Sequence, residues 1–172
     1  METGLTRIAK VAKAKPKEKF TSLAHLINEP MLVECHRKMR ARKASGVDAI
    51  TKEEYDQNLT ANIKDLIERM KRQAYKPQPV RRVYIPGYED KLVQMNLAKI
   101  LNAIYEADFL DCSYGFRPGR SCHDALKALN KIIENKGINY IVDADIRGFF
   151  DHVDHDWMMK FIGERIADPN IK

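Results

Sequence analysis

Nine consecutive residues in the last third of the chain, DADIRGFFD, constrain the fold more than any other feature. They span Asp143 to Asp151 and directly follow the apolar run INYIV at residues 138–142. The apolar run predicts a buried strand, which places Asp143 and Asp145 on one face because side chains alternate along a strand. Carboxylates at a strand end hold hard cations such as Mg²⁺, which grip phosphate oxygens and activate hydroxyl nucleophiles. The segment indicates metal-assisted chemistry, with a solvated acidic turn as the plain alternative.

The composition narrows the class of protein. The chain has 172 residues, 44% of them hydrophobic, which is enough for a packed core. Thirty Lys and Arg against 24 Asp and Glu give a net charge of +6, which favours a polyanionic partner such as nucleic acid. Three cysteines without CxxC spacing predict reduced thiols and no zinc site. No apolar run approaches the roughly 18–20 residues of a membrane span, so no membrane partner is expected.

Apolar residues recur at helical spacing over most of the chain. The Thr51 and Ser121 side chains are expected to cap helices, and Leu126, Leu129 and Ile132 share one apolar helix face. Two segments favour strands, so the predicted fold class is α+β. The predicted helices cover 20–42, 52–72, 89–107, 121–135 and 156–166, and the predicted strands lie in 79–86 and 138–146.

Basic residues gather in three places. HRKMRARK supplies five cations that favour RNA contact, because arginine forks grip phosphates; a solvated helix end is the alternative. In SYGFRPGRS, two arginines alternate with aromatics, a combination suited to nucleic acid. In PVRRVYIP, either phosphate contact or protection of a strand edge explains the arginine pair. The residues are Arg37, Lys38, Arg40, Arg42 and Lys43 in the first place, Arg117 and Arg120 in the second, and Arg81 and Arg82 in the third.

Four blocks together carry a resemblance. They are KASGVDAIT (43–51), YIPGYEDKLVQ (84–94), SYGFRPGRSCHDAL (113–126) and DADIRGFFD. In this order and at these distances, they resemble the N-terminal half of the reverse transcriptases encoded by group II introns, which are also called maturases. The resemblance implies helix-rich polymerase fingers and the first part of a palm sheet. It also implies a basic N-terminal arm (1–19), a fingers region (20–110), and a fingers–palm junction with the start of the palm (111–172). From the residues alone, 1–19 is either a frayed end or an arm that touches RNA, and the spacing of Arg7, Ile8 and Val11 fits a short amphipathic helix within it.

The resemblance also implies roles for individual residues. Asp145 corresponds to a catalytic, Mg²⁺-binding aspartate, with Asp143 as its rival and the carbonyl of Ile146 as a further ligand. Phe150, five positions after Asp145, corresponds to the aromatic residue that crowds the sugar 2′ position. Arg82 and Arg117 correspond to nucleotide-binding cations, whereas Arg120 joins the RNA-binding set.

The implied activity is RNA-directed DNA polymerisation, together with assistance to intron splicing. The implied partners are group II intron RNA, an RNA template with a DNA primer, and dNTPs; a homodimer is also allowed, and the implied location is the bacterial cytoplasm. Two departures stand against full activity. The hairpin that follows Ile-Pro in the family is absent after Pro86, and no Tyr-Ala-Asp-Asp block is present.

Because two-metal phosphoryl transfer needs ligands from both carboxylate blocks, this chain alone is not expected to polymerise DNA. Two other functions remain open. One is a non-catalytic RNA-binding module, and the other is a retron-like or domesticated bacterial reverse transcriptase.

Overall fold

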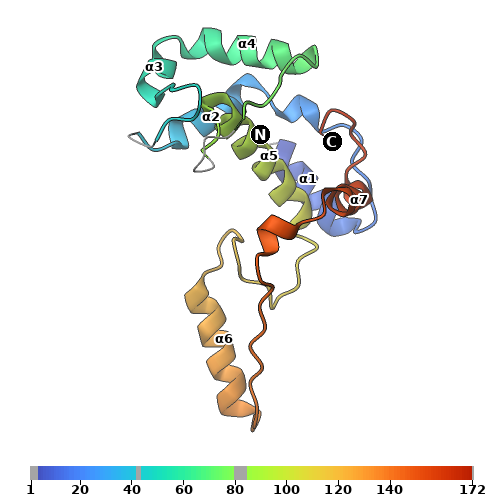
Figure 1. Cartoon of the computed structure of the whole chain (residues 1–172). Coiled ribbons are helices and arrows are strands. Elements are labelled where there is room, and N and C mark those ends of the chain that lie inside the picture. The colour runs from blue at the N-terminus through green and yellow to red at the C-terminus, as the bar shows by residue number, and fades with distance from the viewer. Residues whose placement is uncertain (1–3, 42–43, 80–84, 172) are drawn as a thin grey trace.

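The computed structural model describes residues 4–41, 44–79 and 85–171 (Figure 1). α1 to α5 and α7 form a body, from which residues 121–148 project (Figure 1). We call residues 121–148 the projection. In the described part of the chain, the helices are too short or too polar to cross a bilayer. In chain order, the elements are α1 (Gly4–Ala14), the 3-10 helix η1 (Ala24–Leu26), α2 (Glu29–Lys38), α3 (Lys52–Gln57), α4 (Leu59–Lys71), α5 (Tyr88–Tyr105), α6 (Cys122–Asn135), the 3-10 helix η2 (Phe149–His152) and α7 (His155–Arg165).

The predicted α+β class is wrong. Over the described residues, the only β pairing is an isolated parallel bridge between Phe20 and Ile166, so the structure contains no palm sheet. Residues 138–146 run back beside α6 without a strand partner (Figure 1). A strand is defined by hydrogen bonds to a neighbouring strand, and no neighbour is present here. Most of the other predicted strand, residues 80–84 with Arg82, lies outside the described residues.

Helix starts follow the predicted capping chemistry. The Thr51 hydroxyl accepts from the backbone N–H of Glu54, whose carboxylate accepts in return from the N–H of Thr51. Ser121 and Asp124 form the same reciprocal box at the start of α6. These boxes satisfy backbone donors that the first turn of a helix leaves open. Local sequence therefore sets where α3 and α6 begin.

One hydrophobic core lies between α2, α3, α4 and α5. Leu32 and Cys35 of α2 and Ile63 and Leu66 of α4 are fully buried against Leu92 of α5. The aromatic rings of Tyr55 and Tyr88 stack within this core, with centroids 4.5 Å apart. The apolar residues of α2, α4 and α5 lie on one face of each helix, and that face packs against this core, as the sequence periodicity predicts.

A second core joins the two ends of the chain. Leu23, Ile104 and Ile166 are fully buried here, and Leu5 and Ile8 of α1 pack against them. The Asp168 carboxylate accepts from the backbone N–H groups of Leu23 at 2.5 Å and Ala24 at 2.9 Å. Near this core, Arg165 pairs with Asp108. The amphipathic helix expected near the N-terminus is observed as α1, whereas contact of this segment with RNA stays a prediction.

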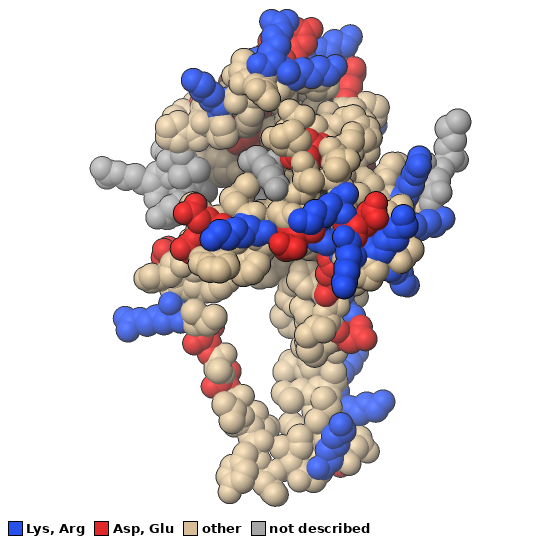
Figure 2. All heavy atoms as spheres, turned by 90° about the vertical axis from the view of Figure 1, so that its right-hand side faces the viewer, with Lys and Arg blue, Asp and Glu red and all other residues tan. Residues whose placement is uncertain are grey.

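The projection lies outside both cores. α6 has no buried residue, and its predicted apolar face is open, with Leu126 62% exposed. Tyr140 and Val142 on the returning segment are even more exposed. In the space-filling view, the two limbs stand apart and charged side chains are sparse where they face each other (Figure 2). The periodicity of α6 is therefore amphipathic as predicted, but its apolar face has no partner within the described residues.

Candidate nucleic-acid and catalytic site

Arg117 organises the SYGFRPGRS loop from inside. It is 8% exposed, and its guanidinium donates to the Glu106 carboxylate at 2.7 Å and to the carbonyls of Leu110 at 2.8 Å and Ser113 at 2.9 Å. The guanidinium carbon also lies 5.0 Å from the centroid of the Phe109 ring. Hydrogen bonds from Arg117 hold the pKa of the Glu106 carboxyl below its usual value. The nucleotide-binding role of Arg117 stays a prediction, because the described contacts are all within the loop and α5.

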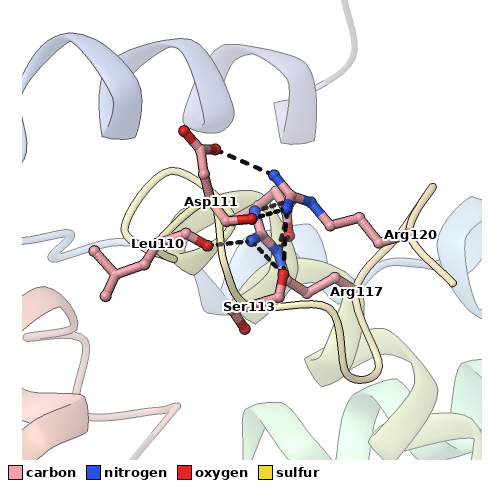
Figure 3. A network of polar contacts seen from close by, with 6 residues as sticks. Leu110, Asp111, Ser113, Arg117 and Arg120 are labelled. Atoms are coloured by element: carbon pink, nitrogen blue, oxygen red, sulfur yellow. Dashed lines mark hydrogen bonds and ion pairs between the residues drawn. The ribbon is translucent and has the colours of Figure 1, made fainter. Parts of the chain in front are cut away.

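Arg120 braces the same loop from its outer side. Its guanidinium donates to the backbone carbonyl of Asp111 and pairs with the Asp111 carboxylate at 3.2 Å, so it converges with Arg117 on one stretch of backbone (Figure 3). The guanidinium also covers the ring of Tyr114 at 5.3 Å. Next to Arg117, Phe116 is fully exposed and has a φ of +55°, a backbone region that bulky residues seldom adopt. The loop therefore presents Phe116 to solvent.

The DADIRGFFD segment leads from the projection back to the body. The side chains of Asp143 and Asp145 are exposed, and Ile146 is 66% exposed. Gly148 follows with a φ of +61°, and its carbonyl accepts from the backbone N–H of Asp151 at 3.0 Å. This tight turn begins η2.

Phe150 lies on η2 and is 84% exposed. Its ring meets that of Phe149 edge-on, with centroids 5.3 Å apart. No hydrogen bond or packing contact given by the structure assigns Phe150 to a sugar-binding role, so that role stays a prediction. What the structure supplies is an accessible aromatic ring five residues after Asp145.

The predicted RNA-binding cluster is only partly described. Arg37, Lys38 and Arg40 are exposed at the C-terminal end of α2. Lys38 pairs with Glu34 at 2.7 Å, and this contact, together with Lys99 on α5, lowers the pKa of Glu34 to about 2. Arg42 and Lys43 lie outside the described residues.

Sequence reasoning missed a polar network under this basic cluster. His36 is 3% exposed; its Nδ1 lies 2.8 Å from the hydroxyl of Tyr88, and its Nε2 lies 3.0 Å from a carboxylate oxygen of Asp56. In the sequence, His36 stood only as one polar residue beside the arginines. The network ties α2 to α3 and α5, and only tertiary packing brings these three groups together.

Comparison with known proteins decides the family. A family model described as reverse transcriptase (RNA-dependent DNA polymerase) matches residues 70–170, which is more than half of the chain. The chain belongs to the reverse transcriptase family. The matched region contains the Arg117 loop, α6, and the complete DADIRGFFD segment.

Relatives support the group II resemblance. The group II intron-encoded protein LtrA of Lactococcus lactis subsp. cremoris is 35% identical to this chain, over 95% of the chain and 29% of its own length. Protein YkfC of Escherichia coli (strain K12) is 30% identical, over 94% of the chain and 48% of its own length. The nuclear intron maturase 1, mitochondrial, of Arabidopsis thaliana is 30% identical, over 50% of the chain and 12% of its own length. The resemblance is therefore confirmed, and the chain spans less than half the length of each of these relatives.

Reverse transcriptase membership implies a divalent metal cation. Carboxylate and carbonyl oxygens, as at Asp143, Asp145 and Ile146, are the hard ligands that such cations prefer. However, no group of three or more His, Cys, Asp or Glu side chains that could hold a metal exists among the described residues. The donor chemistry fits the cation, and the described part of the chain supplies an incomplete set of ligands.

Proposed function

We propose that this chain forms the part of a group II intron-encoded RNA-directed DNA polymerase that carries its first catalytic aspartates. The observation that carries the proposal is the DADIRGFFD segment, which lies inside the region matched by the family model and leaves both carboxylates accessible. Asp145 and the carbonyl of Ile146 would hold Mg²⁺, with Asp143 as the rival ligand. The bound cation supplies charge neutralisation for the transferring phosphoryl group.

The test uses the complete parent enzyme, in which the remaining ligands are expected. Asp145→Asn preserves size and hydrogen bonding but removes the charge that holds the cation. Primer extension should fall by several orders of magnitude, as expected when electrostatic stabilisation of phosphoryl transfer is removed. RNA binding should persist, because it does not need that carboxylate. Asp143→Asn is the matched control: if it abolishes synthesis while Asp145→Asn retains it, the assignment of Asp145 and the role of Phe150 are both wrong.

We further propose that the chain binds RNA through the end of α2, with intron RNA, template–primer and dNTPs as partners of the parent. The exposed cations Arg37 and Arg40 support this, as do relatives named as intron-encoded protein and intron maturase. The five-residue alanine variant of Arg37, Lys38, Arg40, Arg42 and Lys43 should bind structured intron RNA more weakly. It should also show a flatter salt dependence, by about 0.7–0.9 of a slope unit for each phosphate that the variant no longer neutralises. Unchanged affinity and an unchanged salt slope would indicate that the cluster is a solvated helix end that does not contact RNA.

The proposal also includes a homodimer and a bacterial cytoplasmic location. The exposed apolar face of α6 offers surface for a second subunit. Three cysteines without CxxC spacing are typical of a reducing compartment. Sedimentation of the parent protein tests the dimer, and cell fractionation tests the location.

A further inference from the structure

A cavity of about 510 Å³ lies between the end of α2, the loop before α3, and α5. Its volume falls within the roughly 300–1,000 Å³ of typical small-ligand pockets. Lys38, Arg40, Lys52 and Lys91 line it, and none of its described lining residues is acidic. A cavity with four cations and no carboxylate is suited to an anionic ligand.

Three of these cations, Arg40, Lys52 and Lys91, form no ion pair with a carboxylate of the described residues. The ammonium group of Lys52 donates to the carbonyl of Met39 at 2.6 Å, and that of Lys91 donates to the carbonyl of Ala44 at 3.0 Å. Carbonyl oxygens fix the positions of these ammonium groups without cancelling their charge. Arg40 is exposed and forms no ion pair with any described carboxylate. Lys38 differs, because it is paired with Glu34.

The cavity also has an apolar side. Met39, Ile50, Met95 and Ala98 line it beside the cations, and Gln94 adds an amide that has no hydrogen bond to a described residue. Charge alone would suit any anion, but apolar surface next to fixed cations suits a ligand that has both a phosphate and a flat base.

We propose that this cavity binds one unstacked nucleotide of single-stranded RNA. Arg40, Lys52 and Lys91 contact its phosphate, the base lies on the surface formed by Met95 and Ala98, and Gln94 contacts the base edge. The inference rests on the proposed RNA binding of the chain and gives it a specific site, distinct from the DADIRGFFD segment. A base paired within a duplex cannot enter the cavity, so the site selects single strands.

The experiment measures fluorescence anisotropy of the 172-residue chain with a labelled single-stranded oligouridylate and with an RNA duplex of equal length. Ala98→Phe fills the apolar side without changing charge, and Ala61→Phe, on the exposed face of α4, is its control. Arg40→Gln/Lys91→Gln removes two cavity cations, and Lys64→Gln/Lys71→Gln removes two from α4. Circular dichroism confirms that each variant is folded.

Ala98→Phe should weaken single-strand binding about tenfold, the size expected when one base can no longer stack on the protein, with an unchanged salt slope and unchanged duplex binding. Arg40→Gln/Lys91→Gln should flatten the salt slope for the single strand by about 0.7, because the variant no longer neutralises the one bound phosphate. If each variant matches its control while the wild-type chain binds RNA, the cavity proposal is overturned and the proposed function stands. If the wild-type chain binds neither RNA, both fail.

Discussion

Replacing Arg117 separates a loop-building role from a nucleotide-binding role. The side chain is 8% exposed and donates to the Glu106 carboxylate and to the carbonyls of Leu110 and Ser113. Removing one partner of a buried ion pair costs about 3–5 kcal/mol. Because the Glu106 side chain is 37% exposed, water can reach its carboxylate after the change. We therefore expect Arg117→Ala to lower the free energy of unfolding by about 3 kcal/mol, the lower end of that range.

The assay is urea denaturation of the 172-residue chain, followed by far-ultraviolet circular dichroism. Arg117→Lys should recover less than half of the stability, because a lysine ammonium lacks the planar fork that reaches the carboxylate and both carbonyls together. Arg120→Ala is the control, with an expected change of less than about 1 kcal/mol, since its partner Asp111 is fully exposed. If Arg117→Ala unfolds at the wild-type urea concentration, the loop-building argument is refuted. Loss of primer extension when Arg117→Ala is introduced into the complete parent enzyme would then support the nucleotide-binding role.

Three further outcomes are expected. Gly46→Ala should destabilise the chain, because a Cβ there would lie 2.3 Å from the carbonyl oxygen of Pro86. Thermal melting tests this, and an unchanged melting temperature would show that the segments around Gly46 and Pro86 move apart without a cost in stability. Leu66→Ala, in the first core, should lower the unfolding free energy by about 2–5 kcal/mol, whereas Leu126→Ala on α6 should lower it little. Equal effects of the two variants in urea denaturation would mean that the apolar face of α6 is buried against another surface. Burial raises the pKa of Tyr88 to about 12, so its contribution to the free energy of unfolding is complete below pH 10 and is lost as pH rises toward 12. Stability in urea and phenolate absorbance, measured across this pH interval, should change together. Phenolate formation without a fall in stability would contradict this expectation.

The sequence by itself determined where α3 and α6 begin, although the predicted helix 20–42 is observed only as η1 and α2. The capping boxes at Thr51 and Ser121 lie within one turn of the chain, so their hydrogen bonds need no distant partner. The continuous helix predicted over 52–72 is interrupted at Asn58, which separates α3 from α4. The four motif blocks also identified the family, because they lie along the chain in a fixed order.

Only the tertiary structure decided which predicted features obtain partners. Residues 138–146 have the composition of a strand, but strand pairing is a property of two segments, and the described chain supplies no second one. The partners of Arg117 lie within 11 residues along the chain, but its charge alone favours phosphate, and only the folded loop places the guanidinium against Glu106 and two carbonyls. The cavity around Lys52 and Lys91 joins residues far apart in sequence. Spacing along the chain cannot encode such neighbours, since burial and charge pairing depend on which surfaces meet.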